Sequence, residues 1–155
     1  MSMRTAIFPG SFDPFTIGHL DLVERGLQLF DRVVIGIGKN SEKRAMFPLA
    51  FREESIRKLF ENEPRVVVDV YEGLTVDFAR RWDAHFLLRG VRSVQDFVYE
   101  ESMAEANRQL DGIETVVLYA RPEHAYISSS LVRELYGYKK DVQAMVPYPL
   151  GEVRS

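Results

Sequence analysis

A histidine near the start of the chain follows a loop that contains two glycines and a serine, an arrangement suited to binding phosphate. The loop spans residues 9–18 and is followed by His19. Gly10 lets the backbone approach a ligand closely, and the Ser11 hydroxyl can bind a phosphate oxygen. If His19 is the third residue of a helix, its ring and the N–H groups of the first turn converge on one anion. A phosphate there would raise the pKa of the ring above about 6.5. The alternative is an ordinary turn before a surface helix, since such fragments are common.

Arginines and serines later in the chain offer further groups for a phosphate. Arg89 and Arg92 flank Gly90, and guanidinium groups donate forked hydrogen bonds to phosphate oxygens. Three consecutive serines at 128–130 open a predicted helix, where they either cap the helix or hold a phosphate. Taken singly, solvated arginines and capping serines are the common alternatives. We expect an anion site if the fold brings these groups to the first loop.

The elements that must position these groups follow an alternating pattern. Apolar runs of strand length alternate with segments of helical period, which is typical of βαβ units around a parallel sheet. Strands are expected at 5–8, 32–37, 65–71, 85–88 and 115–119. Helices are expected at 17–30, with Thr16 as its N-cap, and at 50–62, 75–83, 95–110, 129–136 and 141–145. The pattern predicts an α/β fold with a doubly wound, five-stranded parallel sheet. Its ligand cleft should lie beyond the first and fourth strands.

The size and charge of the chain restrict its class. At 155 residues and 46% hydrophobic content it can bury one sizeable core, so we expect a single domain over residues 1–155. With 20 basic and 23 acidic side chains, the formal charge of -3 gives no general attraction to nucleic acid or to an anionic membrane. The chain has no cysteine, no basic and apolar leader, and no apolar run of about 18 residues. A cytoplasmic protein without a membrane anchor is expected.

The first loop as a whole is more specific than its parts. Gly-Ser-Phe-Asp-Pro at 10–14 followed by Thr-x-Gly-His at 16–19 resembles the signature of the nucleotidylyltransferase superfamily, in the form of its phosphopantetheine adenylyltransferase branch. The resemblance spans about residues 4–147. Besides the first loop, it includes Lys43, which precedes the pair Met46-Phe47, and the segments 88–100 and 126–134. It implies a Rossmann-like nucleotidylyltransferase fold. It also implies an enzyme of coenzyme A biosynthesis that transfers the adenylyl group of ATP to 4'-phosphopantetheine and releases pyrophosphate.

The resemblance further implies which residues form the site. It makes His19 the group that stabilises the transition state, and it assigns Lys43 and Arg89 to the phosphate of the acceptor. At ATP it places Ser11, Phe12, His19, Gly90, Val91, Arg92, Glu100, His124, Ile127, Ser128, Ser129 and Ser130. At the acceptor it places Ser11, Lys43, Leu74, Thr75, Arg89 and Leu131. For the two leucines, packing in the core is the alternative.

The chemistry of adenylyl transfer agrees with the absence of an obvious general base from these motifs. A phosphate monoester has a second pKa of about 6 and is largely dianionic at neutral pH, so it needs no base to attack. Positioning and electrostatic stabilisation must then carry the rate. The resemblance implies Mg²⁺ as cofactor, with no protein ligand that can be named. It also implies a homohexamer and a capacity for feedback inhibition by coenzyme A.

The sequence leaves two alternative functions open, and at one position it departs from the family pattern. One rival is a nucleotidylyltransferase with another acceptor, against which Thr16 and the segment 127–134 argue. The other is a non-catalytic nucleotide-binding module on the same fold, against which the joint presence of histidine, lysine and two arginines argues. His124 stands where relatives often carry an aromatic ring near adenine. A histidine there departs from the family pattern for stacking on adenine.

Overall fold

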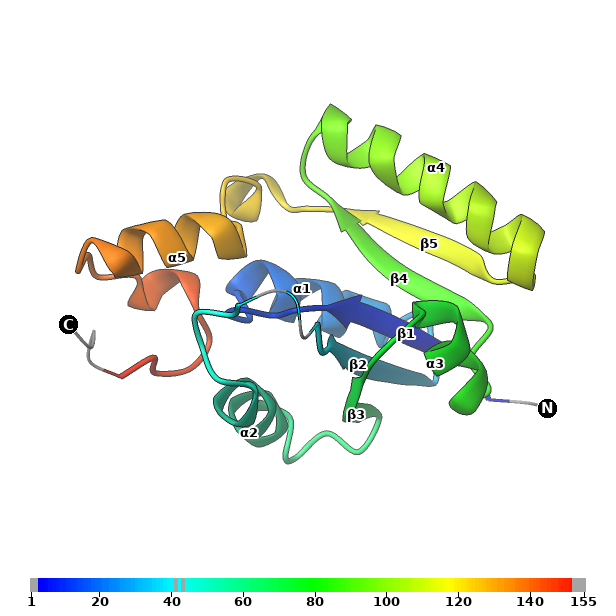
Figure 1. Cartoon of the computed structure of the whole chain (residues 1–155), viewed down its shortest axis with the longest axis horizontal. Coiled ribbons are helices and arrows are strands. Elements are labelled where there is room, and N and C mark those ends of the chain that lie inside the picture. Colours follow the sequence, from blue (N-terminus) through cyan, green and yellow to red (C-terminus); the bar gives the residue numbers. More distant parts are fainter. Residues whose placement is uncertain (1–2, 41, 43, 152–155) are drawn as a thin grey trace.

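The computed structural model describes residues 3–40, 42 and 44–151, and its strands form one five-stranded parallel sheet (Figure 1). The strand order is β3-β2-β1-β4-β5. The strands are β1 Thr5–Gly10, β2 Arg32–Gly38, β3 Val66–Tyr71, β4 Phe86–Val91 and β5 Glu114–Tyr119. The helices are α1 Ile17–Gly26, α2 Leu49–Leu59, α3 Thr75–Arg81, α4 Val94–Asp111 and α5 Ser129–Gly137, with short 3-10 turns η1 Pro122–His124 and η2 Gln143–Met145. The predicted α/β class and doubly wound parallel sheet are confirmed.

Three element boundaries differ from the predicted ones in a way that matters. β4 continues through 89–91, which pair with β5, so the arginine segment begins inside the strand and not after it. α1 ends at Gly26 instead of residue 30, because the N–H groups of residues 28 and 29 bond three residues back and tighten the last turn. The predicted helix at 141–145 is only the short turn η2. The turn η1 was not predicted at all, although it carries His124.

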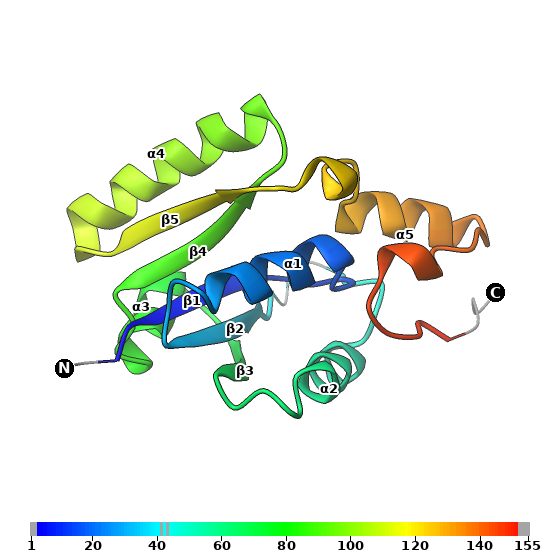
Figure 2. The same ribbon diagram turned by 180° about the vertical axis from the view of Figure 1, so that it is seen from behind.

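Helices cover both faces of the sheet, and the alternation of side chains along each strand gives each face its own core. Ala6 and Phe8 of β1 belong to the core beneath α1, α2 and α5, whereas Ile7 between them belongs to the core beneath α3. The views agree, since α3 lies in front of the sheet in Figure 1 and α1 lies in front in Figure 2. A parallel sheet with two apolar faces requires such cover on both sides.

The winding of the chain reverses between β1 and β4. These strands are neighbours in the sheet, with Ile7 opposite Leu87, although they are far apart in sequence. From β1 the chain continues to β2 and β3 on one side, and from β4 it continues to β5 on the other. The loops that follow β1 and β4 therefore diverge and leave a cleft beyond the carboxyl ends of the strands. This is the place predicted for the ligand.

Candidate active site

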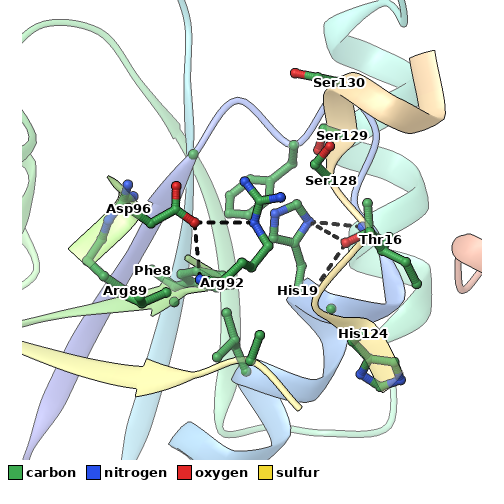
Figure 3. A pocket seen from close by; sticks show the side chains of 18 of the residues that line it. Phe8, Thr16, His19, Arg89, Arg92, Asp96, His124, Ser128, Ser129 and Ser130 are labelled. Carbon is green, nitrogen blue, oxygen red and sulfur yellow. Dashed lines mark hydrogen bonds and ion pairs between the residues drawn. The ribbon is translucent and has the colours of Figure 1, made fainter. Parts of the chain in front are cut away.

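A cavity of about 410 Å³ opens beyond the carboxyl ends of β1 and β4, and we call it the first cavity (Figure 3). Its walls come from the loop after β1, the start of α1, the end of β4, α4 and the segment leading into α5. The residues predicted at ATP all line it, namely Ser11, Phe12, His19, Gly90, Val91, Arg92, Glu100, His124, Ile127, Ser128, Ser129 and Ser130. The fold thus brings the histidine loop, the arginine segment and the serines into one place.

His19 occupies the third position of α1, where a capping box fixes its ring. The ring nitrogen Nδ1 accepts a hydrogen bond from the backbone N–H of Thr16 at 2.9 Å, and the His19 N–H donates to Thr16 Oγ1 at 3.3 Å. Thr16 is therefore the N-cap, as predicted. Because Nδ1 is an acceptor in this bond, the neutral ring carries its proton on Nε2. A doubly protonated ring would lose the bond to Thr16.

The surroundings of His19 favour its neutral form. The ring is enclosed by Phe8, Phe12 and Phe15, whose centroids lie 5.1 to 6.0 Å from its own, although one edge of the residue borders the cavity. Burial, and after it the charges of two nearby arginines, lower the pKa of His19 from 6.5 to about 3. The rise predicted from the sequence concerns a ring beside a bound phosphate, whereas this fall comes from the protein's own groups, namely burial among aromatic rings and two nearby cations.

Arg89 is held on the wall of the first cavity by Glu100. Its Nε and Nη2 donate to the carboxylate of Glu100 at 2.7 to 3.0 Å, and its Nη1 donates to the carbonyl of Pro9 at 3.0 Å. Glu100 is buried, so the carboxylate depends on this cation for compensation. A guanidinium has five N–H donors, and these bonds leave some of them for a ligand. Glu100, predicted at ATP, borders the cavity but binds Arg89.

A second cavity, of about 340 Å³, lies on the face of the sheet covered by α3 and α4. It shares wall residues with the first cavity, namely Pro9, Gly10, Arg89 and Glu100. Leu74 and Thr75, predicted at the acceptor, line it, and Thr75 Oγ1 shares a hydrogen bond with the hydroxyl of Tyr71 at 2.8 Å. Leu131, also predicted there, is not among the wall residues of either cavity in the described part of the chain. The two cavities meet beside Arg89.

The three serines at the start of α5 are all engaged within the protein. Ser128 caps the helix by accepting from a backbone N–H of its first turn at 3.0 Å. Ser129 donates its hydroxyl hydrogen to the carbonyl of Pro14 at 2.8 Å, and Ser130 Oγ accepts from Arg133 at 3.1 Å. The hydroxyl hydrogen of Ser129 is thus already used. Backbone N–H groups at the start of α5 are the better donors for an anion in the first cavity.

Gly90 has a packing role beside its place in the first cavity. A Cβ added at Gly90 would lie 2.3 Å from Cδ1 of Leu22 on α1. Glycine therefore permits the close approach of α1 to the end of β4. The approach brings His19, near the start of the same helix, to the side of Arg92, whose charge acts on the imidazole. Figure 3 shows Arg92, His19 and the serines around the same cavity.

Asp13 and Arg52 tie the loop after β1 to the loop before α2. The buried carboxylate of Asp13 accepts from the backbone N–H groups of residues 46 and 47 at 2.9 and 2.8 Å. Arg52 donates to a carbonyl in each of the two loops at 2.9 and 2.7 Å. Lys43, predicted at the acceptor phosphate, belongs to the second of these loops but lies outside the described residues. Residues 46 and 47 of this loop are therefore held against the loop after β1.

Comparison with known proteins gives a family. The family model described as cytidylyltransferase-like matches residues 7–135. A phosphopantetheine adenylyltransferase of Bacteroides fragilis is 54% identical over 145 residues, covering 94% of this chain and 97% of the relative. One of Phocaeicola vulgatus is 55% identical over 145 residues, covering 94% of this chain and 96% of the relative. The chain belongs to the phosphopantetheine adenylyltransferase family.

Solved structures agree with the fold of this adenylyltransferase. A bifunctional NMN adenylyltransferase/ADP ribose pyrophosphatase from Francisella tularensis, crystallised with AMP and a Mn ion, superposes with a TM-score of 0.66 at 14% identity. The superposition covers 94% of this chain and 44% of that protein, so this chain spans less than half of its length. At this identity the likeness concerns the fold alone, which is that of a Rossmann-like nucleotidylyltransferase.

Several wall residues of the adenylyltransferase cavities were not predicted from the sequence. Asp96 and Arg133 line the first cavity, and Asp96 faces Arg92 at 3.5 Å. On α4, the second cavity is lined by residues 99, 103 and 107. Their spacing in the sequence could have indicated that residues 99, 103 and 107 lie together, because residues four positions apart share one face of a helix. Nothing in the sequence alone distinguished that face from an ordinary surface.

The neutral state of His19 makes the stability of this adenylyltransferase depend on pH. Above pH 6.5 His19 binds no proton in either state, whereas below it the unfolded chain takes one up and the folded chain, with a pKa of about 3, does not. The contribution of His19 to the free energy of unfolding is therefore fully present well above pH 6.5. Between pH 6.5 and about pH 3 it decreases by about 1.4 kcal/mol for each pH unit. Between pH 7 and pH 5, the free energy of unfolding measured in urea should fall by about 2 kcal/mol more in the wild type than in His19→Asn. Equal losses in the two proteins would contradict the assignment, and the exposed His85→Asn variant is the control.

Proposed function

We propose that this chain, acting as one nucleotidylyltransferase domain, transfers the adenylyl group of ATP to 4'-phosphopantetheine and yields dephospho-coenzyme A and pyrophosphate. The observation that carries the proposal is the meeting of two cavities beside Arg89, where Pro9, Gly10, Arg89 and Glu100 line both. A reaction that joins two phosphorylated molecules end to end needs such a junction. Membership of the adenylyltransferase family supports the same reaction.

In this proposal ATP occupies the first cavity. The triphosphate lies where Arg92 and the amino ends of α1 and α5 concentrate positive charge. The base lies farther along the wall, against His124 and Ile127 of the segment that leads into α5. Ser11 and Phe12 close the side next to the histidine loop. This orientation puts the α-phosphorus near His19 and the junction.

The acceptor occupies the second cavity. Its phosphate lies at the junction, where Arg89 borders both cavities. Lys43 is proposed as the second cation for this phosphate, as the family resemblance implies. The pantetheine arm follows the wall formed by Leu74, Thr75 and α4, whose mixed apolar and amide-bearing side chains suit a chain of methylenes and amides. Leu131 is proposed as a further contact of the arm, as the family resemblance implies.

The reaction is an in-line displacement without a covalent enzyme intermediate. An oxygen of the acceptor phosphate forms a bond to the α-phosphorus of ATP, and the bond from that phosphorus to the pyrophosphate oxygen breaks. The dianionic acceptor needs no general base. His19 donates a hydrogen bond from Nε2–H to an oxygen of the α-phosphate, where charge builds up in the transition state. Its neutral ring does this without first losing the capping bond to Thr16.

Mg²⁺ is proposed as the cofactor on the basis of how carboxylates are used around the first cavity. In the part of the chain that the structure describes, no three side chains of His, Cys, Asp or Glu cluster so as to hold a metal ion. Asp96 and Glu100 border the cavity, but both face arginines. This setting fits an ion held by phosphate oxygens and water, which Mg²⁺ favours. When bound, the ion supplies positive charge that neutralises the triphosphate.

The test of the proposed function is pyrophosphate release from ATP and Mg²⁺ with a panel of acceptors. The panel contains 4'-phosphopantetheine, nicotinamide mononucleotide, an alcohol phosphate, and pantetheine without phosphate as the matched control. We expect strong release only with 4'-phosphopantetheine, because only this acceptor has both the phosphate for the junction and the arm for the second cavity. A stronger response to another acceptor would replace the proposal with a different transferase, and no response to any would favour a binding module.

Replacing Lys43 with alanine should raise the KM for phosphopantetheine about tenfold and leave the KM for ATP unchanged. The reason is the loss of one of two cations proposed for a dianionic phosphate at the junction. Lys39→Ala is the matched control, since Lys39 lies nearby in sequence and pairs with Glu72 at 3.4 Å. Initial rates at varied acceptor concentration provide the measurement. An unchanged acceptor KM would remove Lys43 from the site.

We further propose that the chain forms a homo-oligomer, a hexamer according to the family resemblance. α4 leaves Val94, Phe97, Val98 and Leu110 exposed, and such apolar side chains are usually covered in an assembly.

Feedback inhibition by coenzyme A is proposed because coenzyme A shares the pantetheine arm with the acceptor. A cytoplasmic setting is proposed from the lack of cysteine. Of the described helices, none has the length and apolar character to cross a bilayer.

A further inference from the structure

Asp21 of α1 forms a charged cluster with two arginines behind the first cavity. Its carboxylate accepts from Nε of Arg121 at 2.8 Å and from Nη1 of Arg25 at 3.1 Å. Arg25 Nη1 also donates to the carbonyl of Tyr119 at 2.8 Å. The carboxylate is largely buried, with its side chain 11% exposed, and Arg121 is 100 residues away in sequence. One acidic group on α1 thus fixes both sides of the corner where β5 ends.

The corner leads into the segment proposed to contact the base of ATP. At this corner the N–H of Ala120 donates to the carbonyl of Val91. Arg121 is the N-cap of η1, and the carbonyl of Arg121 accepts from the N–H of His124 at 2.9 Å. Ile127 N–H in turn donates to the carbonyl of His124 at 3.0 Å. Ala120, His124 and Ile127 all line the first cavity. The wall around the base is therefore a chain of turns that starts at Arg121.

The far end of this segment is anchored separately, where Ser128 caps α5 and Ser129 binds the loop after β1. Between the two anchors, His124 has a buried Nδ1 for which the described residues provide no hydrogen-bond partner. The position of the imidazole therefore depends on the backbone of η1, since this atom does not fix it. The near anchor is the carboxylate of Asp21, which holds Arg121 at the start of η1.

We propose that Asp21 is a positioning residue that sets affinity for the nucleotide by holding η1 through Arg121 and Arg25. The proposal rests on the placement of ATP in the first cavity. Exposed ion pairs usually contribute little, and the side chain of Arg121 is 53% exposed. Here, however, the carboxylate is buried and shared by two guanidiniums, so its loss leaves two adjacent cations without compensation. The corner would then shift, and the base pocket with it.

The experiment compares Asp21→Asn, Arg121→Gln and the double variant by calorimetric titration with ATP and by steady-state kinetics. We expect each single variant to weaken ATP binding and raise the KM for ATP about tenfold, as follows from losing a charged hydrogen bond. The double variant should be no worse than either single one, because both remove the same link. The KM for phosphopantetheine and kcat should stay within about twofold of wild type, as the residues touch neither the second cavity nor the junction.

Two controls separate this role from general stability. Arg121→Lys keeps the cation and should recover most of the affinity for ATP, whereas Glu53→Gln removes an exposed helical pair at 3.0 Å on α2 and should change nothing. If Asp21→Asn unfolds, the exposed Arg121→Gln decides alone. Unchanged ATP affinity in Arg121→Gln, or equal losses for both substrates, would overturn the proposal. A wild-type protein that binds no ATP would instead refute the proposed function.

Discussion

His19→Asn should lower kcat by about 100-fold to 1,000-fold and change the affinity for ATP by no more than about threefold. The range is that found when a single donor to a developing oxyanion is removed. Nε2–H of the neutral ring is this donor, because Nδ1 is occupied by the backbone N–H of Thr16 at 2.9 Å. ATP affinity changes little, since Arg92 and the helix termini hold the triphosphate in the ground state as well as in the transition state.

Asparagine is chosen because its side-chain oxygen can still accept from Thr16, so α1 keeps its capping box. His19→Ala removes both the donor and the cap, and comparison of the two variants separates catalysis from helix capping. Single-turnover rates measured at saturating substrates, together with ATP titration, give the answer. Near-normal turnover in His19→Asn would remove the ring from the mechanism, and a large loss of ATP affinity would make it a binding group instead.

Arg89→Met should lower kcat/KM for phosphopantetheine about 100-fold or more, with a smaller effect on the KM for ATP. The guanidinium borders both cavities and is proposed to hold the attacking phosphate, so its loss affects the acceptor most. The variant should also be less stable by about 2 kcal/mol, because Glu100 is left as a buried carboxylate without its cation.

The double variant Arg89→Met with Glu100→Gln separates these two effects. Removing the buried charge should restore most of the stability in urea unfolding, whereas the rate with phosphopantetheine should stay low. Such a result would mean that Arg89 acts on the substrate and not only on the fold. Recovery of activity together with stability would show that Arg89 serves only to neutralise Glu100.

The fold could be predicted largely from its sequence, because local patterns determine it. Each strand is an apolar run that a two-sided parallel sheet requires, and Thr16 carries a cap signal that the structure confirms. The cleft followed from topology, since the strand order places β1 beside β4. The end of β4 was predicted too early, because Arg89 and Gly90 read as a loop although they pair with β5.

The parts of the site that could not be predicted depend on contacts between distant residues. The pKa of His19 depends on burial among three phenylalanines, and burial is not visible in a single sequence. The resemblance implies contact of Glu100 with ATP, but it did not reveal that the same carboxylate binds Arg89 across the wall of the cavity. The link from Asp21 to Arg121 spans 100 residues and joins two charges that each look like ordinary surface groups. Motif resemblance located the wall of the cavity, but not the bonds behind it.

The central claim, that the two cavities form one continuous site for both substrates, is tested most directly by competition for the product. Dephospho-coenzyme A contains the nucleotide and the pantetheine arm, so it should occupy both cavities at once. In calorimetric titrations with Mg²⁺ present, saturating ATP alone and saturating phosphopantetheine alone should each abolish binding of dephospho-coenzyme A. Product binding that persists undiminished in the presence of either substrate would contradict the account.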